Sequence, residues 1–193
     1  MSQLEAQPLP YTVLPGLTEK QLAEHYKLYE GYIKKYNELS QLVTKVDPAA
    51  TNATYSEIRE TNLEKVFALD AIKLHEAYFG NMTDTPQQAT GRIKELIEAQ
   101  WGSLEAWATD FAALGIAARG WVVLGWDNDR GQLENYICDA HNQGGVWNTT
   151  AILVLDVYEH AYFLDYGTGR KDYIGVFMDS VNWDTVNTRL PQV

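Results

Sequence analysis

The chain has 193 residues, of which 46% are hydrophobic and 21% are charged, and its formal net charge is −11. This length and apolar fraction suffice for one large domain or for two small domains that share an interface. The acidic balance, which no basic block offsets, argues against nucleic acid as a partner. No apolar run reaches the roughly 18 residues that a membrane span needs, so we also expect no membrane partner. A small anionic substrate would require positive charge concentrated near its site.

The N-terminus and the cysteine content bear on the compartment. Residues 1–16 lack the basic start and apolar middle of a signal peptide, so we expect a cytoplasmic protein. Cys138 is the only cysteine. This excludes an intramolecular disulfide and a cysteine-based zinc site, and we expect a semi-buried structural thiol.

The N-terminal half is predicted to be an extended arm followed by two long helices. Residues 1–16 contain three of the six prolines, and Thr18 then has the character of a helix N-cap. Residues 19–41 and roughly 54–80 show helical spacing of their apolar side chains. Asp47, Pro48 and Asn52 form a short connection between them. Two long helices joined in this way predict an antiparallel hairpin.

The second half changes character after the polar, turn-rich segment 80–90. We place a boundary there, between an N-terminal domain of residues 1–82 and a C-terminal domain of residues 83–193. Residues 91–118 carry two helices with a break at 101–103. Segments 120–126, 132–139 and 151–156 resemble strands, and helices 170–178 and 183–190 follow. The sequence thus predicts an α+β fold, in which a long antiparallel α-hairpin precedes a C-terminal domain with a small three-stranded antiparallel sheet and helices.

The four histidines, His25, His75, His141 and His160, are candidates for chemistry. His25 and His75 fall on the inward faces of the two long helices, although a single histidine on such a face is most often an ordinary core residue. His160 follows Asp156 by four residues, the spacing of one helical turn. Asp156 ends a strongly apolar strand, where a buried carboxylate is costly unless it is paired or bound to a metal. Three imidazoles and one carboxylate suit iron, manganese or zinc, with a further position open for water or substrate.

Two C-terminal segments, DVYEHAYFLDY (156–166) and GRKDYIGVFMDSVNWDTVNTRL (169–190), resemble the signature of the iron/manganese superoxide dismutase family. The resemblance continues upstream through HYKLYEGYIKKYNEL (25–39), LHEAYFGNM (74–82) and GSLEAWATDFAALGIAARGWVVLGW (102–126). It implies disproportionation of superoxide to dioxygen and hydrogen peroxide at one iron or manganese ion per subunit. It also implies four metal ligands, namely His25, His75, Asp156 and His160.

The resemblance implies further roles around the metal. Tyr32 would line the substrate funnel, Trp121 would wall the metal pocket, and Arg170 would place positive charge near the funnel mouth. His141 would hydrogen-bond the metal-bound solvent, with Gln143 as the alternative, and a histidine in that role leans slightly towards iron. Glu159 would reach across a dimer interface to the partner's His160, which implies a homodimer or homotetramer.

The chain departs from the family pattern in three places, and the second and third departures concern proton delivery rather than metal binding. Tyr32 follows His25 by one residue fewer than is usual. Tyr29 stands where the family has a funnel histidine, four residues after the first ligand, and Phe163 stands where a tyrosine usually bonds that histidine across the dimer. A metal-binding member of the same fold with little or no dismutase activity is therefore an alternative. An unrelated zinc hydrolase is a further one, but no general-base carboxylate accompanies the ligand set.

Overall fold

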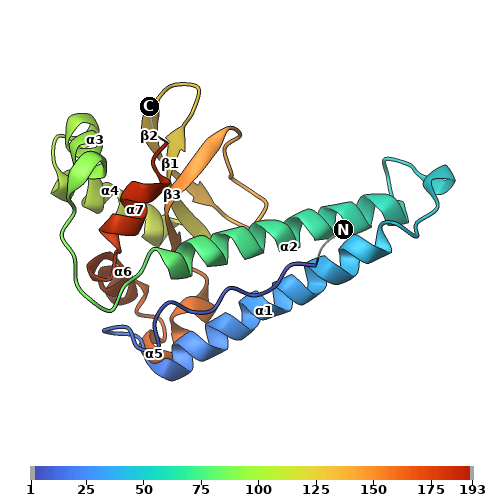
Figure 1. Cartoon of the computed structure of the whole chain (residues 1–193), viewed down its shortest axis with the longest axis horizontal. Helices are drawn as coiled ribbons and strands as arrows, with labels where there is room; N and C mark the ends of the chain where they lie inside the picture. The colour runs from blue at the N-terminus through green and yellow to red at the C-terminus, as the bar shows by residue number, and fades with distance from the viewer. Residues whose placement is uncertain (1–2, 192–193) are drawn as a thin grey trace.

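Two long antiparallel helices form the N-terminal part of the protein (Figure 1). The computed structural model describes residues 3–191. Helix α1 (Glu19–Leu42) and helix α2 (Glu57–Gly80) flank a short 3-10 helix, η1 (Pro48–Ala50). The side chain of Thr18 accepts a hydrogen bond from the backbone N–H of Gln21, as expected of an N-cap. The predicted α-hairpin is confirmed. Within the described range, no helix combines the length and apolar character of a membrane span.

Helix α2 begins three residues later than the sequence predicted. The side-chain oxygen of Asn52 accepts hydrogen bonds from the backbone N–H groups of Thr54 and Tyr55. Asparagine side chains form such local turns in competition with the helix. The helix therefore starts at Glu57, with Ser56 as its N-cap.

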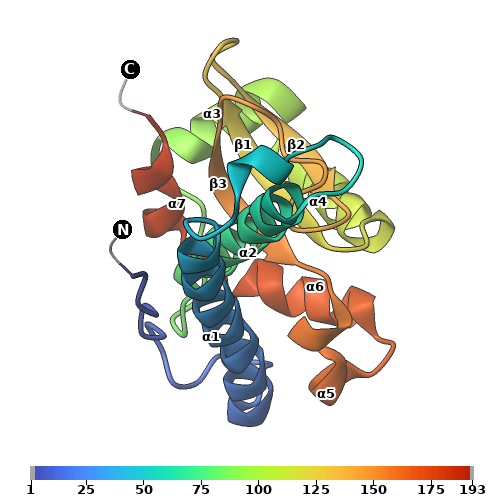
Figure 2. The same ribbon diagram turned by 90° about the vertical axis from the view of Figure 1, so that its right-hand side faces the viewer.

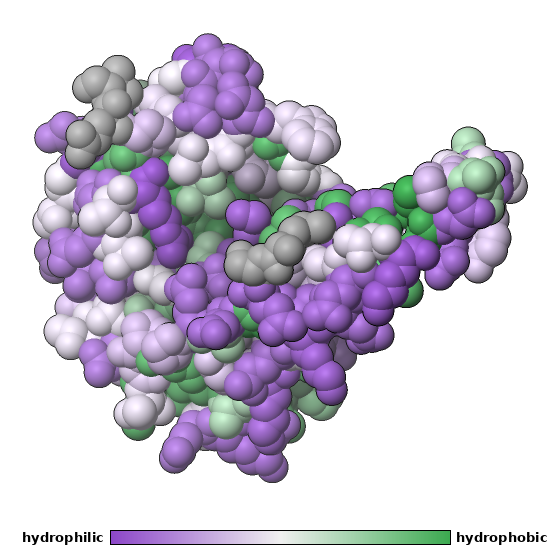
Figure 3. All heavy atoms as spheres, turned by 45° about the vertical axis from the view of Figure 1, so that its right-hand side comes forward, coloured by the Kyte–Doolittle hydropathy of each residue, from purple (hydrophilic) through white to green (hydrophobic). Residues whose placement is uncertain are grey.

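The N-terminal arm runs along the hairpin (Figures 1 and 2). Leu4 exchanges two hydrogen bonds with the side chain of Asn37 on α1. Farther along, the carbonyl of Gln7 accepts a bond from the hydroxyl of Tyr26. These bonds fix an extended segment that has no secondary structure of its own. The surface shown in Figure 3 is largely hydrophilic, in keeping with the high charge.

The C-terminal part contains a three-stranded antiparallel sheet with the strand order β2-β1-β3. Its strands are β1 (Trp121–Asp127), β2 (Gln132–Cys138) and β3 (Thr149–Asp156). Its helices are α3 (Gly91–Trp101), α4 (Leu104–Ala117), α5 (Phe163–Tyr166), α6 (Arg170–Asp179) and α7 (Trp183–Arg189), together with the 3-10 helix η2 (Glu159–Ala161). The α+β prediction is confirmed, and Gly102, at φ +83°, makes the predicted break between α3 and α4.

The strand register places Asp156 at a defined corner of the sheet. Trp121, the first residue of the central strand, pairs with Cys138 on one side and with Asp156 on the other. Strand β3 also packs against α2. The short helices η2 and α5 follow directly and were not predicted, because three or four residues are too few to show a period.

The connection after α2 is tied to the C-terminal helices. The side-chain oxygen of Asn81 accepts bonds from the N–H of Val154 and from the guanidinium of Arg189. Arg189 also donates to the carbonyls of Ala77 and Ile152. A partly buried arginine thus donates hydrogen bonds both to the end of α2 and to the middle of β3. The division into domains at residues 82 and 83 stays a prediction.

We expect Asn81→Ala to lower the free energy of unfolding by about 2–4 kcal/mol, because it leaves the buried N–H of Val154 without an acceptor. Asn62→Ala, within α2, removes only one partly buried bond to the carbonyl of Ile58 and should cost less than about 1 kcal/mol. Urea unfolding of both variants measures the difference. Equal losses would show that the Asn81 junction contributes nothing specific.

Candidate metal centre

Four side chains from distant parts of the chain converge at one point. The ligand atoms of His25, His75, Asp156 and His160 all lie within 4.8 Å of one another. Asp156 Oδ2 lies 3.1 Å from His25 Nε2, 3.2 Å from His160 Nε2 and 3.8 Å from His75 Nε2. The side chains of His25, His75 and Asp156 are at most 1% exposed, whereas that of His160 is 25% exposed. The structure therefore brings together the four residues that the sequence singled out.

Each of these side chains is positioned by a different element. His25 lies in α1 and His75 near the end of α2, while Asp156 is the last residue of β3. His160 lies in η2, so the helical turn expected between Asp156 and His160 does not exist. Instead, the N–H of Tyr158 donates to Asp156 Oδ1 at 2.9 Å in the bend between them. This bond leaves Oδ2 to face the imidazoles.

The electrostatics of the cluster favour an ionised Asp156 carboxylate beside neutral imidazoles of His25 and His75. Burial would raise the pKa of Asp156, but His160 and His25 outweigh it and hold the pKa well below its usual range. Burial lowers the pKa of His75 to about 3, and it also lowers the pKa of His25. For His160, burial would lower the pKa, but Asp156 raises it overall.

The donor set fits a metal ion. His75 Nδ1 lies 2.7 Å from the carbonyl of Ala71, so this nitrogen carries the proton. His75 Nε2 is then a buried lone pair, and among the described residues it has no hydrogen-bond partner. Donors that bind one ion at about 2.1 Å stand roughly 3 Å apart where they are neighbours, as Asp156 Oδ2 stands from His25 and His160. Nitrogen donors with one carboxylate suit iron or manganese.

His141 lies beside the cluster, and both of its ring nitrogens are engaged. The indole N–H of Trp121 donates to His141 Nδ1 at 3.0 Å. Nδ1 is therefore the acceptor, and Nε2 carries the proton that is shared with the hydroxyl of Tyr32 at 2.9 Å. The rings of His141 and His75 are 5.9 Å apart. Gln143, the sequence alternative to His141, is exposed and lies away from these contacts.

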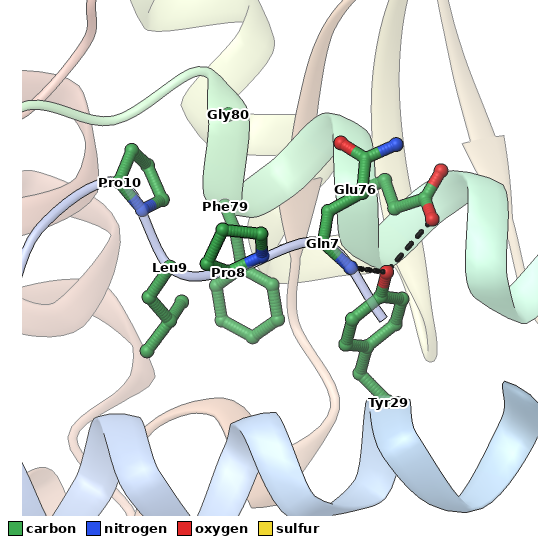
Figure 4. A pocket seen from close by; sticks show the side chains of 8 residues that line it. All are labelled: Gln7, Pro8, Leu9, Pro10, Tyr29, Glu76, Phe79 and Gly80. Carbon is green, nitrogen blue, oxygen red and sulfur yellow. Dashed lines mark hydrogen bonds between the residues drawn. The ribbon is translucent and has the colours of Figure 1, made fainter. Parts of the chain in front are cut away.

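Tyr29 points away from the site that the sequence analysis assigned to it. Its ring stacks beside His75 at 6.3 Å. Its hydroxyl, however, donates to Glu76 at 2.7 Å and accepts from the N–H of Gln7 at 2.9 Å. These contacts belong to a small cavity between the arm and the two helices, with a volume of about 160 Å³ (Figure 4). Tyr29 thus anchors the arm.

Leu28, and not Tyr29, faces Phe163. Both side chains line an open depression over His160, which we call the His160 face; its residues are Lys20, Glu24, Leu28, Glu159, His160, Phe163 and Leu164. Leu28, Phe163 and Leu164 are 41%, 48% and 54% exposed. The sequence reasoning counted four residues forward from His25. Counting four residues back from Tyr32 would have found Leu28. The spacing between His25 and Tyr32 is one residue shorter than usual, so the residue on the same helical face as Tyr32 is Leu28.

The remaining predicted pocket residues take separate positions. Trp121 is fully buried, and its ring lies 5.0 Å from that of His75. Arg170 is partly buried and donates to the carbonyl of Ala118 at 2.7 Å and to the hydroxyl of Tyr162 at 3.1 Å. Its charge is therefore held at the end of α4. Glu159 is exposed on the His160 face.

Two neighbours of His160 escaped the sequence analysis. Tyr158 stacks its ring on that of His160 at 5.2 Å and 17°. The amide of Gln21, which is 1% exposed, donates to the carbonyl of His160 at 2.6 Å and accepts from the N–H of Leu164 at 3.1 Å. Gln21 lies in the first turn of α1, and its long-range contacts show that it joins η2 to α1.

Comparison with known proteins agrees with this arrangement. Residues 89–189 match the family of iron/manganese superoxide dismutases, C-terminal domain. Superoxide dismutase [Fe] of Aquifex pyrophilus is 36% identical over 91% of this chain and 85% of its own length. Superoxide dismutase [Mn] 1 of Haloferax volcanii is 33% identical over 100% and 97%, respectively. Superoxide dismutase [Fe] of Methanothermobacter thermautotrophicus is 31% identical over 99% and 95%.

A buried, redox-suited metal centre between a helical hairpin and a small antiparallel sheet defines a mononuclear metalloenzyme. The chain belongs to the iron/manganese superoxide dismutase family, a family of oxidoreductases. This membership removes the zinc hydrolase considered from the sequence. It leaves open the choice between iron and manganese, because the relatives include both forms.

The metal-free protein should lose stability in acid partly through His141. Burial lowers the pKa of His141 to about 4, whereas an unfolded histidine has a pKa of about 6.5. Stability from this group is complete above pH 6.5 and is lost as the pH falls towards 4. Between pH 7 and pH 5 the loss amounts to about 2 kcal/mol.

A glutamine at position 141 can accept from Trp121 and donate to Tyr32 without titrating. Urea unfolding of metal-free His141→Gln should therefore show a drop between pH 7 and pH 5 that is smaller by this amount. A variant with the same pH dependence as the original chain would contradict the assignment.

Proposed function

We propose that this chain disproportionates superoxide at one iron or manganese ion bound by His25, His75, Asp156 and His160. The unpartnered, buried Nε2 of His75, which lies 3.8 Å from the ionised carboxylate of Asp156, carries the proposal. When bound, the ion would supply the redox chemistry by cycling between the +3 and +2 states, accepting an electron from one superoxide and returning it to a second. Three neutral imidazoles and one carboxylate together carry a single negative charge, which permits the bound ion to adopt both the +3 and the +2 state.

Proton delivery is assigned to Tyr32, because a hydrogen bond from His141 orients its hydroxyl. Trp121 donates to His141, and His141 Nε2–H then donates to Tyr32 Oη. The proton of Tyr32 Oη is therefore free to point elsewhere. Burial raises the pKa of Tyr32, as does the charge of Asp156, so the phenol keeps this proton. Reduced superoxide needs two protons to leave as hydrogen peroxide, and we assign the relay of these protons to Tyr32 Oη.

The substrate anion must approach a protein with a formal net charge of −11. We assign to Arg170 the local positive charge that offsets this repulsion. Its guanidinium is fixed by Ala118 and Tyr162 and also lies over the ring of Tyr162 at 5.9 Å. We favour iron slightly, because the residue assigned as partner of the metal-bound solvent is a histidine, His141, rather than a glutamine. We place the enzyme in the cytoplasm.

The His160 face is proposed to bind a second copy of this chain. Its apolar side chains are half exposed beside a ligand histidine that is itself 25% exposed, and a partner would shield that ligand from water. Exposed Glu159 would then reach the partner's His160. The resulting assembly is a homodimer, from which a homotetramer could be built. Leu28 of one subunit and Phe163 of the other would form an apolar contact. In the family pattern, a histidine and a tyrosine form a hydrogen bond there.

His75→Ala should abolish metal retention and superoxide removal, because it removes one of the four donors. Lys73→Ala, exposed on the same helix, is the matched control and should retain both. Elemental analysis and a superoxide-removal assay of iron- and manganese-loaded protein make the measurement. A fully metallated His75→Ala would overturn the ligand assignment. A metallated original chain without activity would favour the alternative of a metal-binding member with little dismutation.

Phe163→Glu should convert the dimer to monomers, because it places a charge in the apolar part of the His160 face. Leu63→Glu alters a side chain of similar exposure, 43%, on the hairpin away from this face, and it should leave the mass unchanged. Sedimentation velocity of both variants separates the outcomes. A Phe163→Glu protein that keeps the mass of the original assembly would exclude this face as the interface.

A further inference from the structure

A pair of buried phenols ends on the backbone of Asp156. Tyr173 Oη donates to the main-chain carbonyl of Asp156 at 2.7 Å, and Tyr78 Oη lies 3.0 Å from Tyr173 Oη. Both tyrosines are 0% exposed. A phenol has a single proton. Because Tyr173 uses its proton on Asp156, Tyr78 must be the donor to Tyr173, and the hydrogen bonds run in one direction.

This chain of hydrogen bonds connects three elements that surround the metal cluster. Tyr78 lies on α2, three residues after His75, and its ring is 5.1 Å from that of His25. Tyr173 lies on α6 and stacks on Tyr162 at 4.9 Å and 20°. The hydroxyl of Tyr173 therefore links α2 and α6 to the last residue of β3. Neither phenol was given a role by the sequence analysis or by the proposed function.

The backbone of Asp156 needs such support because the chain leaves the sheet at this residue. The following N–H, that of Val157, donates to the carbonyl of Gly120 at 2.8 Å. The N–H of Tyr158 holds carboxylate Oδ1. The bond from Tyr173 fixes the carbonyl of Asp156 itself. These three bonds together determine the direction in which Oδ2 points, midway between His25 and His160.

We propose that Tyr173 is a positioning residue, whose hydroxyl, oriented by Tyr78, holds Asp156 so that carboxylate Oδ2 stays within reach of all three imidazoles. The inference rests on the proposed ligation of the metal by Asp156. Tyr173 then sets how firmly the ion is retained and how symmetric its surroundings are. Groups that orient a ligand in this way typically change metal affinity 10- to 100-fold.

The alternative role for Tyr173 is purely structural, as a ring that fills the core and a donor that satisfies a buried carbonyl. Tyr173→Phe keeps the ring and its stacking on Tyr162 and removes only the hydroxyl. Tyr166→Phe is the matched control, because Tyr166 also donates its hydroxyl to a backbone carbonyl, that of Gly16, and lies beside Tyr173 but outside the cluster. Tyr78→Phe keeps the bond from Tyr173 to Asp156 but removes its orienting donor.

The experiment uses manganese-loaded full-length protein. Metal loss to an excess of chelator gives the rate of dissociation, and the electron paramagnetic resonance spectrum of Mn(II) reports the symmetry of the site. We expect Tyr173→Phe to lose manganese at least about tenfold faster than the original chain and to show an altered zero-field splitting. Tyr78→Phe should change both in the same direction but less, and Tyr166→Phe should change neither.

Two results would overturn the inference alone. The first is a Tyr173→Phe protein with the dissociation rate and spectrum of the original chain, whatever its thermal stability. If Tyr173→Phe does not fold, the second is a Tyr78→Phe protein in which both measurements are unchanged. An original chain that fails to bind manganese or iron at all would overturn the proposed function and this inference together, so the two failures are distinguishable.

Discussion

The buried charge of Asp156 is the constraint on which the rest of the structure depends. A carboxylate with no solvent exposure loses its hydration, and this loss destabilises the fold unless other groups replace the water. Here the imidazoles of His25 and His160 lie within 3.2 Å of one oxygen, and a backbone N–H holds the other. The Nε2 lone pair of His75 also faces this carboxylate, but it cannot donate a hydrogen bond to it.

That constraint explains the architecture around it. Asp156 is fixed at a corner of the sheet, so the histidines must be brought to it. The antiparallel hairpin of α1 and α2 does this, because His25 near the start of α1 and His75 near the end of α2 lie at the same end of the hairpin. Asn81 and Arg189 join the end of α2 to β3, and Gln21 joins the start of α1 to η2. The ligand geometry is thus held by hydrogen bonds that lie one layer outside it.

The parts of this arrangement that the sequence predicted are those with a repeating pattern or a specific resemblance. Periodicity gave the long helices and the strands, and the buried position of Asp156 together with three histidines gave the cluster. Periodicity could not predict η2 or α5, because three or four residues are too few to show a repeating pattern of apolar side chains. The family resemblance assigned the funnel position to Tyr29, whereas the shorter spacing between His25 and Tyr32 rotates the helical face, so that Leu28 lines the same depression as Phe163. The direction of the bonds through His141 depends on which nitrogen Trp121 contacts, which only coordinates reveal.

The apolar pair formed by Leu28 and Phe163 bears on how protons reach the centre. Neither side chain can donate or accept, so the His160 face cannot relay protons through these two positions. The proposed route is through Tyr32, and the hydrogen bonds that orient its hydroxyl run from Trp121 through His141 in a single direction. Because Trp121 can only donate, His141 cannot reverse this order without turning its ring. Under the proposed function, proton supply rests on this one oriented hydroxyl of Tyr32, and the proposed role of the buried phenols Tyr78 and Tyr173 is to hold the carboxylate of Asp156 in place.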